Sequence, residues 1–306
     1  MVSIASGTET VDISHDRLSL TLVPGIGGAI AAFRRRMEDG SVIDLLRPMD
    51  AASLAKGDVL GASCFPLTPF SNRLRAGHCH FGHHDITLPL NSDGPHVEHG
   101  HGWQRPWELV ARSTDTATLV YRHQPDAWPF AYEMRQTFAL LTDHLSVTIE
   151  TVNLAAEPMP YGFGLHPYFP RTANCDLRAK VGGFWETDGE VMPTKLVPVP
   201  AHSDLNRTIR VDDHELDNAF TDWNGAAIIT WPENGVRLYL TASAPLRFLV
   251  VYIPQGEDHF CVEPVSNCTD AFNLANERND TGMRILPPGG KMKAEIGFKI
   301  DVIRTT

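Results

Sequence analysis

The stretch Leu145-Ser146-Val147-Thr148-Ile149-Glu150 alternates apolar and polar side chains without a break. Successive side chains of an extended chain point to opposite faces, so this period of two predicts a β-strand with one buried and one solvent-facing side. The same alternation recurs far away along the chain, in Leu18–Leu22 and in Val236–Leu240. Strand patterns in such distant parts of the sequence favour an all-β protein.

Short stretches of turn-forming residues separate many of these runs. Four of them each lie between two strand-like segments: Pro24–Gly28, Ser113–Asp115, Thr142–His144 and Glu233–Gly235. Such spacing is typical of β-hairpins, so we expect mostly antiparallel pairing between successive strands. The 24 glycines and 22 prolines fit a fold with many short strands and turns.

No linker, repeat or long charge block divides the 306 residues. β-Sandwiches and barrels can reach this length as one unit. We therefore expect a single all-β domain over residues 1–306, with short helices only in Met49–Lys56 and Ala271–Arg278. Pro193–Asn206 is the most loop-like stretch, and we expect it to be an excursion within that domain.

Composition excludes several classes of partner. The formal net charge of −11 argues against nucleic acid, whose binding depends on neutralisation of phosphates by Lys and Arg. Met1–Asp16 lacks the features of a signal peptide, and no apolar run approaches the roughly 20 residues that span a bilayer. The five cysteines form no C-x-x-C pair and predict no disulfide framework. We expect a cytoplasmic protein that binds neither nucleic acid nor membranes.

Four segments combine polar groups with aromatic rings. His166 lies within Tyr161-Gly-Phe-Gly-Leu-His-Pro-Tyr-Phe-Pro170, and the others are Asn72-Arg73, His99-Gly100 and Glu263-Pro264. Together they supply a guanidinium, two imidazoles and a carboxylate. Such a set suits a small polar molecule with flat apolar faces that undergoes proton transfer, and a sugar fits this description.

Each of these residues also has a structural interpretation. Arg73 could tie down a loop through carbonyl oxygens, and His166 could be a buried histidine held by backbone groups. Glu263 follows apolar residues, where a charge is expensive to bury, so it either pairs with a cation or has a raised pKa. Asp217 gives a weaker signal of the same kind and could simply cap a turn.

The histidine-rich region raises the question of a metal. His99-x-His101 could face one side of an extended chain, as in a cupin-type metal site, but the next carboxylate that could complete such a site is Glu108, too far along. We therefore expect no metal and interpret four further histidines as surface or turn residues: His78, His80, His83 and His84. Gly100 and Gly102 would allow a ligand to approach His99 closely. Nucleotide-binding loops and nucleophile elbows are missing from the sequence, so we also expect no cofactor.

Taken in order, these segments resemble the aldose 1-epimerase (mutarotase) family. The matching motifs are Asn72-Arg73, His99-Gly100, His166-Pro-Tyr-Phe169, Asp217 and Glu263-Pro264, and the resemblance covers roughly Leu18–Phe298. It implies a single-domain antiparallel β-supersandwich of the galactose mutarotase type, with an open cleft for a monosaccharide. His101 and Trp103 depart from the family's commoner His-Gly-Gly pattern and could reshape the pocket.

The resemblance also implies a reaction, the interconversion of α and β anomers by ring opening and reclosure. It assigns Glu263 as the base and His166 as the acid. The substrate-binding residues that it implies are Arg73, His99, Asp217, Asn72 and Trp103. Phe163 and Tyr168 are further candidates for an aromatic floor beneath the sugar.

Other functions stay open at this point. The family includes relatives that act on hexose 6-phosphates, and Arg75 and Arg105 are candidate phosphate ligands. The net charge gives an anionic substrate no long-range attraction, so we favour a neutral aldose. A non-catalytic sugar-binding module and a cupin-like metalloenzyme are further alternatives. The sequence indicates neither which sugar binds nor the oligomeric state.

Overall fold

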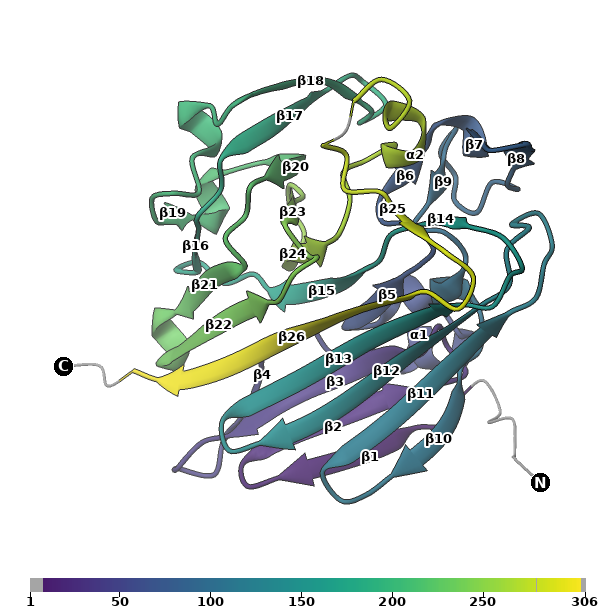
Figure 1. Cartoon of the computed structure of the whole chain (residues 1–306). Coiled ribbons are helices and arrows are strands. Elements are labelled where there is room, and N and C mark those ends of the chain that lie inside the picture. Colours follow the sequence, from purple (N-terminus) through teal and green to yellow (C-terminus); the bar gives the residue numbers. More distant parts are fainter. Residues whose placement is uncertain (1–7, 279, 304–306) are drawn as a thin grey trace.

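The computed structural model describes residues 8–278 and 280–303 and consists mainly of antiparallel strands (Figure 1). The alternation in the sequence is the reason. In β13 (His144–Asn153), every second residue from Leu145 onward is buried, while the residues between them are partly exposed. The prediction of an all-β, antiparallel fold with few short helices is confirmed.

Two large sheets form the body of the protein. The larger one has eleven strands, and in spatial order it contains β1 (Val11–His15), β2 (Leu18–Val23), β3 (Ala29–Arg36), β5 (Cys64–Leu67), β15 (Gly164–Pro170), β24 (His259–Val265), β23 (Phe248–Ile253), β20 (Leu216–Thr221), β17 (Gly183–Thr187) and β18 (Pro193–Pro198), with β4 (Val42–Asp44) beside β3. The second has nine strands, in the order β10 (Glu108–Arg112), β11 (Thr116–His123), β12 (Tyr132–Leu141), β13, β26 (Lys291–Val302), β22 (Val236–Ala242), β21 (Ala226–Trp231), β16 (Asp176–Ala179) and β19 (Ile209–Arg210).

Smaller elements connect and cover these sheets. Three two-stranded sheets pair β14 (Met159–Tyr161) with β25 (Arg284–Leu286), β6 (Arg73–Leu74) with β9 (Val97–Glu98), and β7 (His78–Phe81) with β8 (His84–Thr87). Within the described ranges, α-helix is confined to α1 (Ala51–Lys56) and α2 (Ala271–Leu274). The part of the chain that the structure describes also has six 3₁₀ turns: η1 (Val59–Gly61), η2 (Arg75–Gly77), η3 (Gly102–Gln104), η4 (Ala201–Ser203), η5 (Val211–Asp213) and η6 (Pro232–Asn234).

All four predicted hairpins are present. The turns join β2 to β3, β10 to β11, β12 to β13 and β21 to β22, and each pair is antiparallel. The helix expected in Met49–Lys56 forms as α1, whose start is capped by the Asp50 carboxylate. The helix expected in Ala271–Arg278 is wrong in length. It stops at Leu274, and beyond it the N–H of Glu277 makes a turn-type bond to the carbonyl of Leu274.

The stretch Pro193–Asn206 departs from the prediction of a loop. Its first half is β18, which pairs with β17 at the end of the larger sheet. An edge strand needs hydrogen bonds on one side only, so the prolines at both ends of β18 are tolerated although they lack an N–H. Prolines that suggest a loop in the sequence can therefore also mark an edge strand.

The core lies between the two large sheets. Phe33 of β3 and Phe298 of β26 meet edge to face with ring centroids 6.3 Å apart, and one contiguous cluster of buried side chains includes residues of both sheets. This continuity is the basis on which we infer that the chain is one domain. All five cysteines are buried and unpaired, as the absence of a disulfide pattern predicted.

The membrane predictions have separate outcomes. No helix within residues 8–278 and 280–303 is long and apolar enough to cross a bilayer. The expectation that Met1–Asp16 contains no signal peptide falls partly on residues 1–7, which lie outside the described residues.

Candidate active site

Strand register brings the predicted acid and base together. β15 lies between β5 and β24 and pairs His166 with Phe65. Gly164 is opposite Val265 and Tyr168 opposite Cys261, and this register sets His166 opposite Glu263. Directly opposed residues of antiparallel strands share one face of a sheet. His166 and Glu263, 97 positions apart in the sequence, therefore lie side by side.

The same face continues across the next two strands. β23 pairs Val250 with Glu263 and Tyr252 with Cys261, and β20 pairs Asp217 with Tyr252. Asp217 thus joins the row from the far side, as a residue within a strand rather than a turn cap. A cavity of about 190 Å³ lies over this face, and its lining includes His166, Glu263 and Asp217.

Arg73 and His99 enter the cavity from the pair β6 and β9, and Asn72 links the two. The N–H of Asn72 donates to Nδ1 of His99 at 3.1 Å, and the N–H of His99 donates to the carbonyl of Asn72 at 2.8 Å. Both residues have left-handed backbones, with φ of 59° and 58°. Such conformations cost about 1–3 kcal/mol each in non-glycine residues and persist where the surroundings enforce them, often at functional sites. Asn72 therefore holds Arg73 and His99 in place, although it also lines the cavity.

The glycines beside His99 have a different role from the predicted one. A Cβ on Gly100 would lie 2.2 Å from the carbonyl oxygen of Thr68, and one on Gly102 would lie 2.2 Å from the Thr68 side chain. The expectation that these glycines admit a ligand is thus wrong. Instead, the segment at Thr68 occupies the space beside both glycines. It packs against the turn and fixes the direction of His99.

Two carboxylates flank the guanidinium of Arg73. Nε lies 3.2 Å from Oε1 of Glu98, and Nη2 lies 3.5 Å from Oδ2 of Asp217. All three side chains are partly buried, between 22% and 29% exposed, and all three line the cavity. Burial is the main cause that raises the pKa of Asp217, and Arg73 opposes this shift. The guanidinium is thereby held in one orientation with its charge largely compensated.

Glu263 and His166 form a buried pair. Nε2 of His166 lies 3.4 Å from Oε1 of Glu263, and both side chains are under 10% exposed. Within the described residues, Oε2 of Glu263 and Nδ1 of His166 have no hydrogen-bond partner. Native proteins rarely leave buried polar atoms unpaired, because each costs about 1–3 kcal/mol. Unpaired atoms on both members of an acid–base pair beside a cavity point to a ligand-binding role.

Burial shifts the pKa values of this pair in opposite directions. It raises the pKa of Glu263 well above its usual value, with a further contribution from the negative charge of Asp217. Burial likewise lowers the pKa of His166 well below the usual imidazole value, with a further contribution from His99. Both shifts disfavour the charged form. Burial therefore shifts each member of the pair toward its neutral form.

His99 is a neutral hydrogen-bond donor. Burial, followed by the nearby charge of Arg73, lowers the pKa of His99 to about 3. Its Nδ1 accepts the N–H of Asn72, so the single proton of the neutral ring is on Nε2. The ring stands edge to face with that of His166, with centroids 5.1 Å apart. A cavity-lining N–H donor of this kind can bind a sugar oxygen.

Trp103 does not line the cavity, contrary to the prediction that it binds substrate. Its indole is 2% exposed and stacks on Phe65 at 5.2 Å, and Phe65 in turn packs against His166 at 4.7 Å. His101 is also directed away, with Nε2 3.0 Å from the Tyr132 hydroxyl. Both residues shape the pocket only indirectly, because large rings at these positions fill the space behind it.

One of the other aromatic candidates reaches the site. Tyr168 lines the cavity and stacks on His166 with centroids 4.6 Å apart, whereas Phe163 is fully buried elsewhere. The guanidinium of Arg47 lies 4.2 Å from the Tyr168 ring on its other flank and donates to the carbonyls of Leu60 and Ala62. Tyr168 is therefore held firmly beside the acid–base pair.

Comparison with known proteins agrees with this arrangement. Residues 9–299 match the family described as aldose 1-epimerase.

The chain belongs to the aldose 1-epimerase family.

A protein of Escherichia coli (strain K12), named uncharacterized protein YphB, is 32% identical over 299 residues, covering 94% of this chain and 98% of that protein. Two solved structures are similar in fold. A galactose mutarotase-like protein from Clostridium acetobutylicum is 19% identical with a TM-score of 0.86, covering 96% of this chain and 95% of that chain. A GalM/aldose epimerase homologue from C. elegans is 19% identical with a TM-score of 0.83, covering 97% of this chain and 99% of that chain. The predicted family and galactose mutarotase type of fold are confirmed.

Four residues that line this cavity of the epimerase fold were missed by sequence reasoning: Leu60, Glu98, Val250 and Tyr252. Glu98 immediately precedes His99, so its position next to a candidate site residue was a signal in the sequence that could have identified it. Tyr252 and Val250 belong to a strongly apolar strand and reach the site only through pairing with β24. No local signal in the sequence marks them.

Three potential metal ligands meet beside the cavity, two of which, His166 and Glu263, line it. Ligand atoms of His166, Cys261 and Glu263 lie within 4.8 Å of one another. Burial raises the pKa of Cys261 well above the usual thiol value, with a further contribution from Glu263. Metals bind the thiolate rather than the thiol, so this donor set is poorly suited to one. Metal independence stays a prediction.

Proposed function

We propose that this protein is an aldose 1-epimerase that interconverts the α and β anomers of a neutral monosaccharide. The pair Glu263–His166, 3.4 Å apart at the cavity, is the observation that carries the proposal. Anomerisation needs one group to remove a proton and another to supply one. A cavity of about 190 Å³ also suits one sugar ring, because sites for larger ligands usually run to roughly 300–1,000 Å³.

The reaction follows from the two groups. Glu263 as a carboxylate accepts the proton of the C1 hydroxyl while the bond from C1 to the ring oxygen breaks, and His166 donates its proton to that oxygen. The electron pair of the O–H bond forms the C1 carbonyl. After rotation about the C1–C2 bond, the former ring oxygen attacks the other face of the carbonyl. Glu263 returns its proton to the new C1 hydroxyl, and His166 recovers its own, so no cofactor or water is consumed.

The opposed pKa shifts suit this cycle. General catalysis is most effective when the acid and the base have pKa values near one another and near the working pH. Burial raises the pKa of Glu263, which makes its carboxylate a stronger base, and lowers that of His166, which makes its protonated ring a stronger acid. A stronger base and a stronger acid each promote the proton transfer that we assign to them.

The remaining polar groups suit substrate binding. We assign Arg73 and His99 as donors to sugar oxygens, where they also oppose the negative charge that develops in the transition state. Asp217 accepts hydrogen bonds from sugar hydroxyls on the far side of the ring. Asn72 positions Arg73 and His99 through its backbone and side-chain contacts.

The charges at the cavity favour a neutral sugar over a sugar phosphate. A phosphate dianion normally needs two or more converging cations. Arg73 lies between the carboxylates of Glu98 and Asp217, and Glu263 adds a third acidic group. Neither Arg75 nor Arg105 is among the residues lining the cavity. Arg75 is 47% exposed and lies 3.6 Å from the Asp270 carboxylate.

Polarimetry tests this proposal directly. Freshly dissolved α-glucose, α-galactose and other aldoses change optical rotation slowly on their own, and the protein should accelerate this change for at least one of them. Glucose 6-phosphate in the same assay separates the two substrate classes. Binding of a sugar without any acceleration would instead favour a non-catalytic sugar-binding module. The unpaired buried cysteines fit a reducing compartment, and we propose the cytoplasm as the location.

A further inference from the structure

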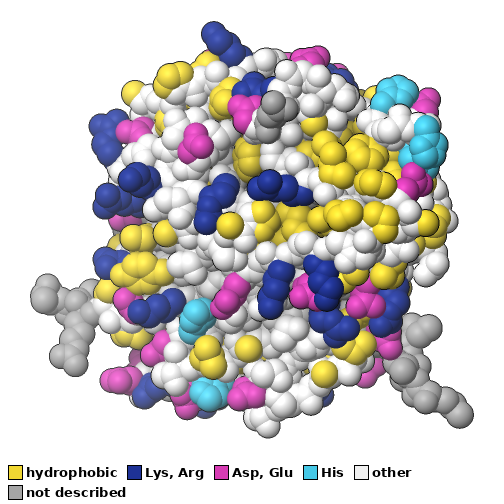
Figure 2. All heavy atoms as spheres, viewed as in Figure 1, with side chains coloured by type: hydrophobic (Ala, Val, Ile, Leu, Met, Phe, Trp, Pro, Cys, Tyr) yellow, Lys and Arg dark blue, Asp and Glu magenta, His cyan; other side chains and the backbone are white. Residues whose placement is uncertain are grey.

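The hairpin of β7 and β8 carries polar and apolar residues on opposite faces. Cys79 and Ile86 are paired with each other, point inward and are buried. The other face carries His78, His80 and Asp85, with His80 and Asp85 directly paired across the strands. Figure 2 shows histidine and acidic side chains gathered on the surface over this hairpin. Two imidazoles and one carboxylate thus share one exposed face.

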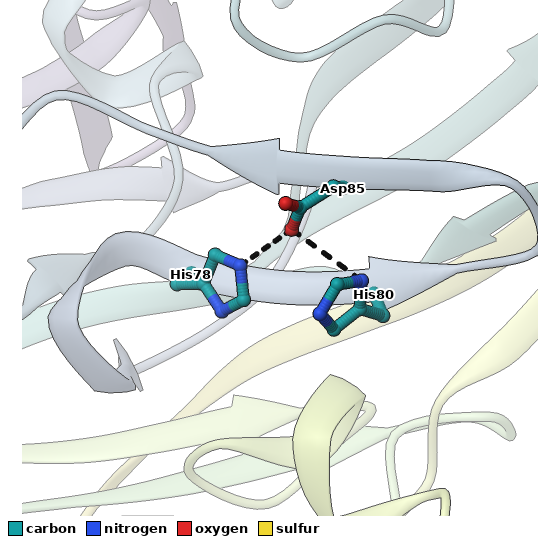
Figure 3. A group of neighbouring side chains, drawn as sticks. All are labelled: His78, His80 and Asp85. Carbon is teal, nitrogen blue, oxygen red and sulfur yellow. Dashed lines mark hydrogen bonds and ion pairs between the residues drawn. The ribbon is translucent and has the colours of Figure 1, made fainter.

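The three side chains converge on one point (Figure 3). Nε2 of His78 lies 2.5 Å from Oδ1 of Asp85, and Nδ1 of His80 lies 3.4 Å from the same oxygen. One ligand atom from each residue lies within 4.8 Å of the other two. In a tetrahedral zinc site, bonds of about 2.0–2.1 Å place neighbouring ligand atoms roughly 3.4 Å apart. Small side-chain rotations would give all three atoms that spacing.

The backbone fixes this arrangement in part. His78 and His80 lie two residues apart on one strand, so their side chains leave the same face. The Asn273 side chain of the α2 segment donates to the carbonyl of His78 at 2.9 Å, which ties the hairpin to the body of the protein. Pre-organised ligands lose less conformational freedom when they bind.

We propose that His78, His80 and Asp85 form a surface site for a divalent first-row transition metal, with Zn²⁺ as the best match. Imidazole and carboxylate are common zinc ligands, and three protein ligands leave a fourth position for water. The side chains are between 42% and 67% exposed, so an ion reaches them directly. The ligands lie on β7 and β8, which form a two-stranded sheet of their own. A bound ion would therefore cross-link the two strands of the hairpin. This proposal departs from the sequence-based expectation of no metal.

A second group on the same hairpin fits a metal less well. His83, His84 and Glu157 also lie within 4.8 Å of one another through their ligand atoms. However, the His83 and His84 rings pack against each other, with centroids 4.1 Å apart and planes inclined by 34°. His84 also packs against Phe130 at 4.9 Å. These contacts restrict the rotation that would be needed to bring both imidazoles to one ion.

The test is Zn²⁺ titration of the full chain after removal of any affinity tag, by isothermal calorimetry in a buffer that does not bind zinc. We expect one Zn²⁺ per chain in the wild type. His80→Ala and Asp85→Asn should each weaken binding by about tenfold or more, because even second-shell changes at metal sites cost about 10–100-fold. His202→Ala, which removes an exposed histidine elsewhere, and His83→Ala should bind as the wild type does.

Melting temperatures measured with and without Zn²⁺ give a second readout, because a ligand that binds only the folded state raises the melting temperature. The increase should vanish in His80→Ala and persist in His202→Ala. The proposal is overturned if the wild type binds no Zn²⁺, if His80→Ala and Asp85→Asn bind it unchanged, or if His83→Ala is the variant that loses it. These results are independent of the sugar assay, since none of the three ligands lines the cavity.

Discussion

Replacement of Glu263 by glutamine tests the role of this residue in catalysis separately from its effect on the stability of the fold. Gln has nearly the shape of Glu but cannot accept a proton at ordinary pH, so Glu263→Gln removes the proposed base while it preserves packing. A positioned base typically contributes about 10²–10⁴-fold to a rate. Each factor of ten corresponds to about 1.4 kcal/mol, so the expected increase in activation free energy is about 2.7–5.4 kcal/mol. Sugar affinity should change little, because Arg73, His99 and Asp217 remain.

Glu263→Gln should also change how the free energy of unfolding depends on pH. Burial raises the pKa of Glu263 in the folded protein above the reference value of 4.5. The folded state therefore binds this proton more tightly than the unfolded state, and the resulting stabilisation is lost as the pH rises from about 4.5 through the folded pKa. Each unit of that rise in pKa corresponds to about 1.4 kcal/mol. Glu263→Gln lacks this loss, so its stability relative to the wild type should increase with pH across this window.

Asp270→Asn is the matched control. Asp270 is a mostly buried carboxylate outside the cavity lining, and burial raises its pKa too. Its Oδ1 accepts the N–H of Arg75 at 3.1 Å and an N–H of Asn273 at 2.8 Å. Asn keeps an oxygen that can accept these bonds but replaces the charged Oδ2, 3.6 Å from Nε of Arg75, by an amide donor, so we expect a destabilisation of about 1–3 kcal/mol while most of kcat remains.

Initial rates by polarimetry and urea unfolding between pH 4 and 9 supply the measurements for both variants. Near-normal mutarotation by Glu263→Gln would refute the assignment of the base. A stability difference between this variant and the wild type that does not vary with pH would refute the argument from burial.

Three further predictions follow from the site. His166→Asn should lower kcat by about 10²-fold or more. In the wild type, the acidic limb of the profile of kcat/KM against pH should lie above the ordinary carboxyl range and the alkaline limb below the ordinary imidazole range, because burial raises the pKa of Glu263 and lowers that of His166. A flat profile from about pH 5 to 9 would contradict this pair. Exhaustive chelation should leave the rate of mutarotation unchanged. Polarimetry measures this rate, and elemental analysis checks that the metal has been removed. A loss of activity that Zn²⁺ restores would refute metal independence. Glucose or galactose should be preferred over glucose 6-phosphate in kcat/KM, and a phosphate preference lost in Arg75→Ala or Arg105→Ala would reverse this conclusion.

The outcome at individual residues shows what local sequence can and cannot indicate. Apolar alternation in Leu145–Glu150 reports which side chains are buried, and burial is what selects strand and hairpin, so the fold class was predictable. Trp103 lies in the His-Gly segment of the family motif, and the resemblance predicts that it binds substrate. Its indole instead packs behind Phe65, since the turn at Gly100 and Gly102 directs it inward. Proximity along the chain does not fix the direction of a side chain.

The sequence by itself determined the strand pattern, the hairpins, the family motifs and the residue types available for proton transfer, because periodicity and local composition act over a few neighbouring positions. Only the tertiary structure decided which of these groups meet. Glu263 and His166 become neighbours through the register of β15 against β24, and Asp217 joins them through β20 and β23. Arg73 becomes charge-compensated because Glu98 and Asp217 approach it from different elements. The opposed pKa shifts likewise depend on burial, which results from the packing of the whole chain.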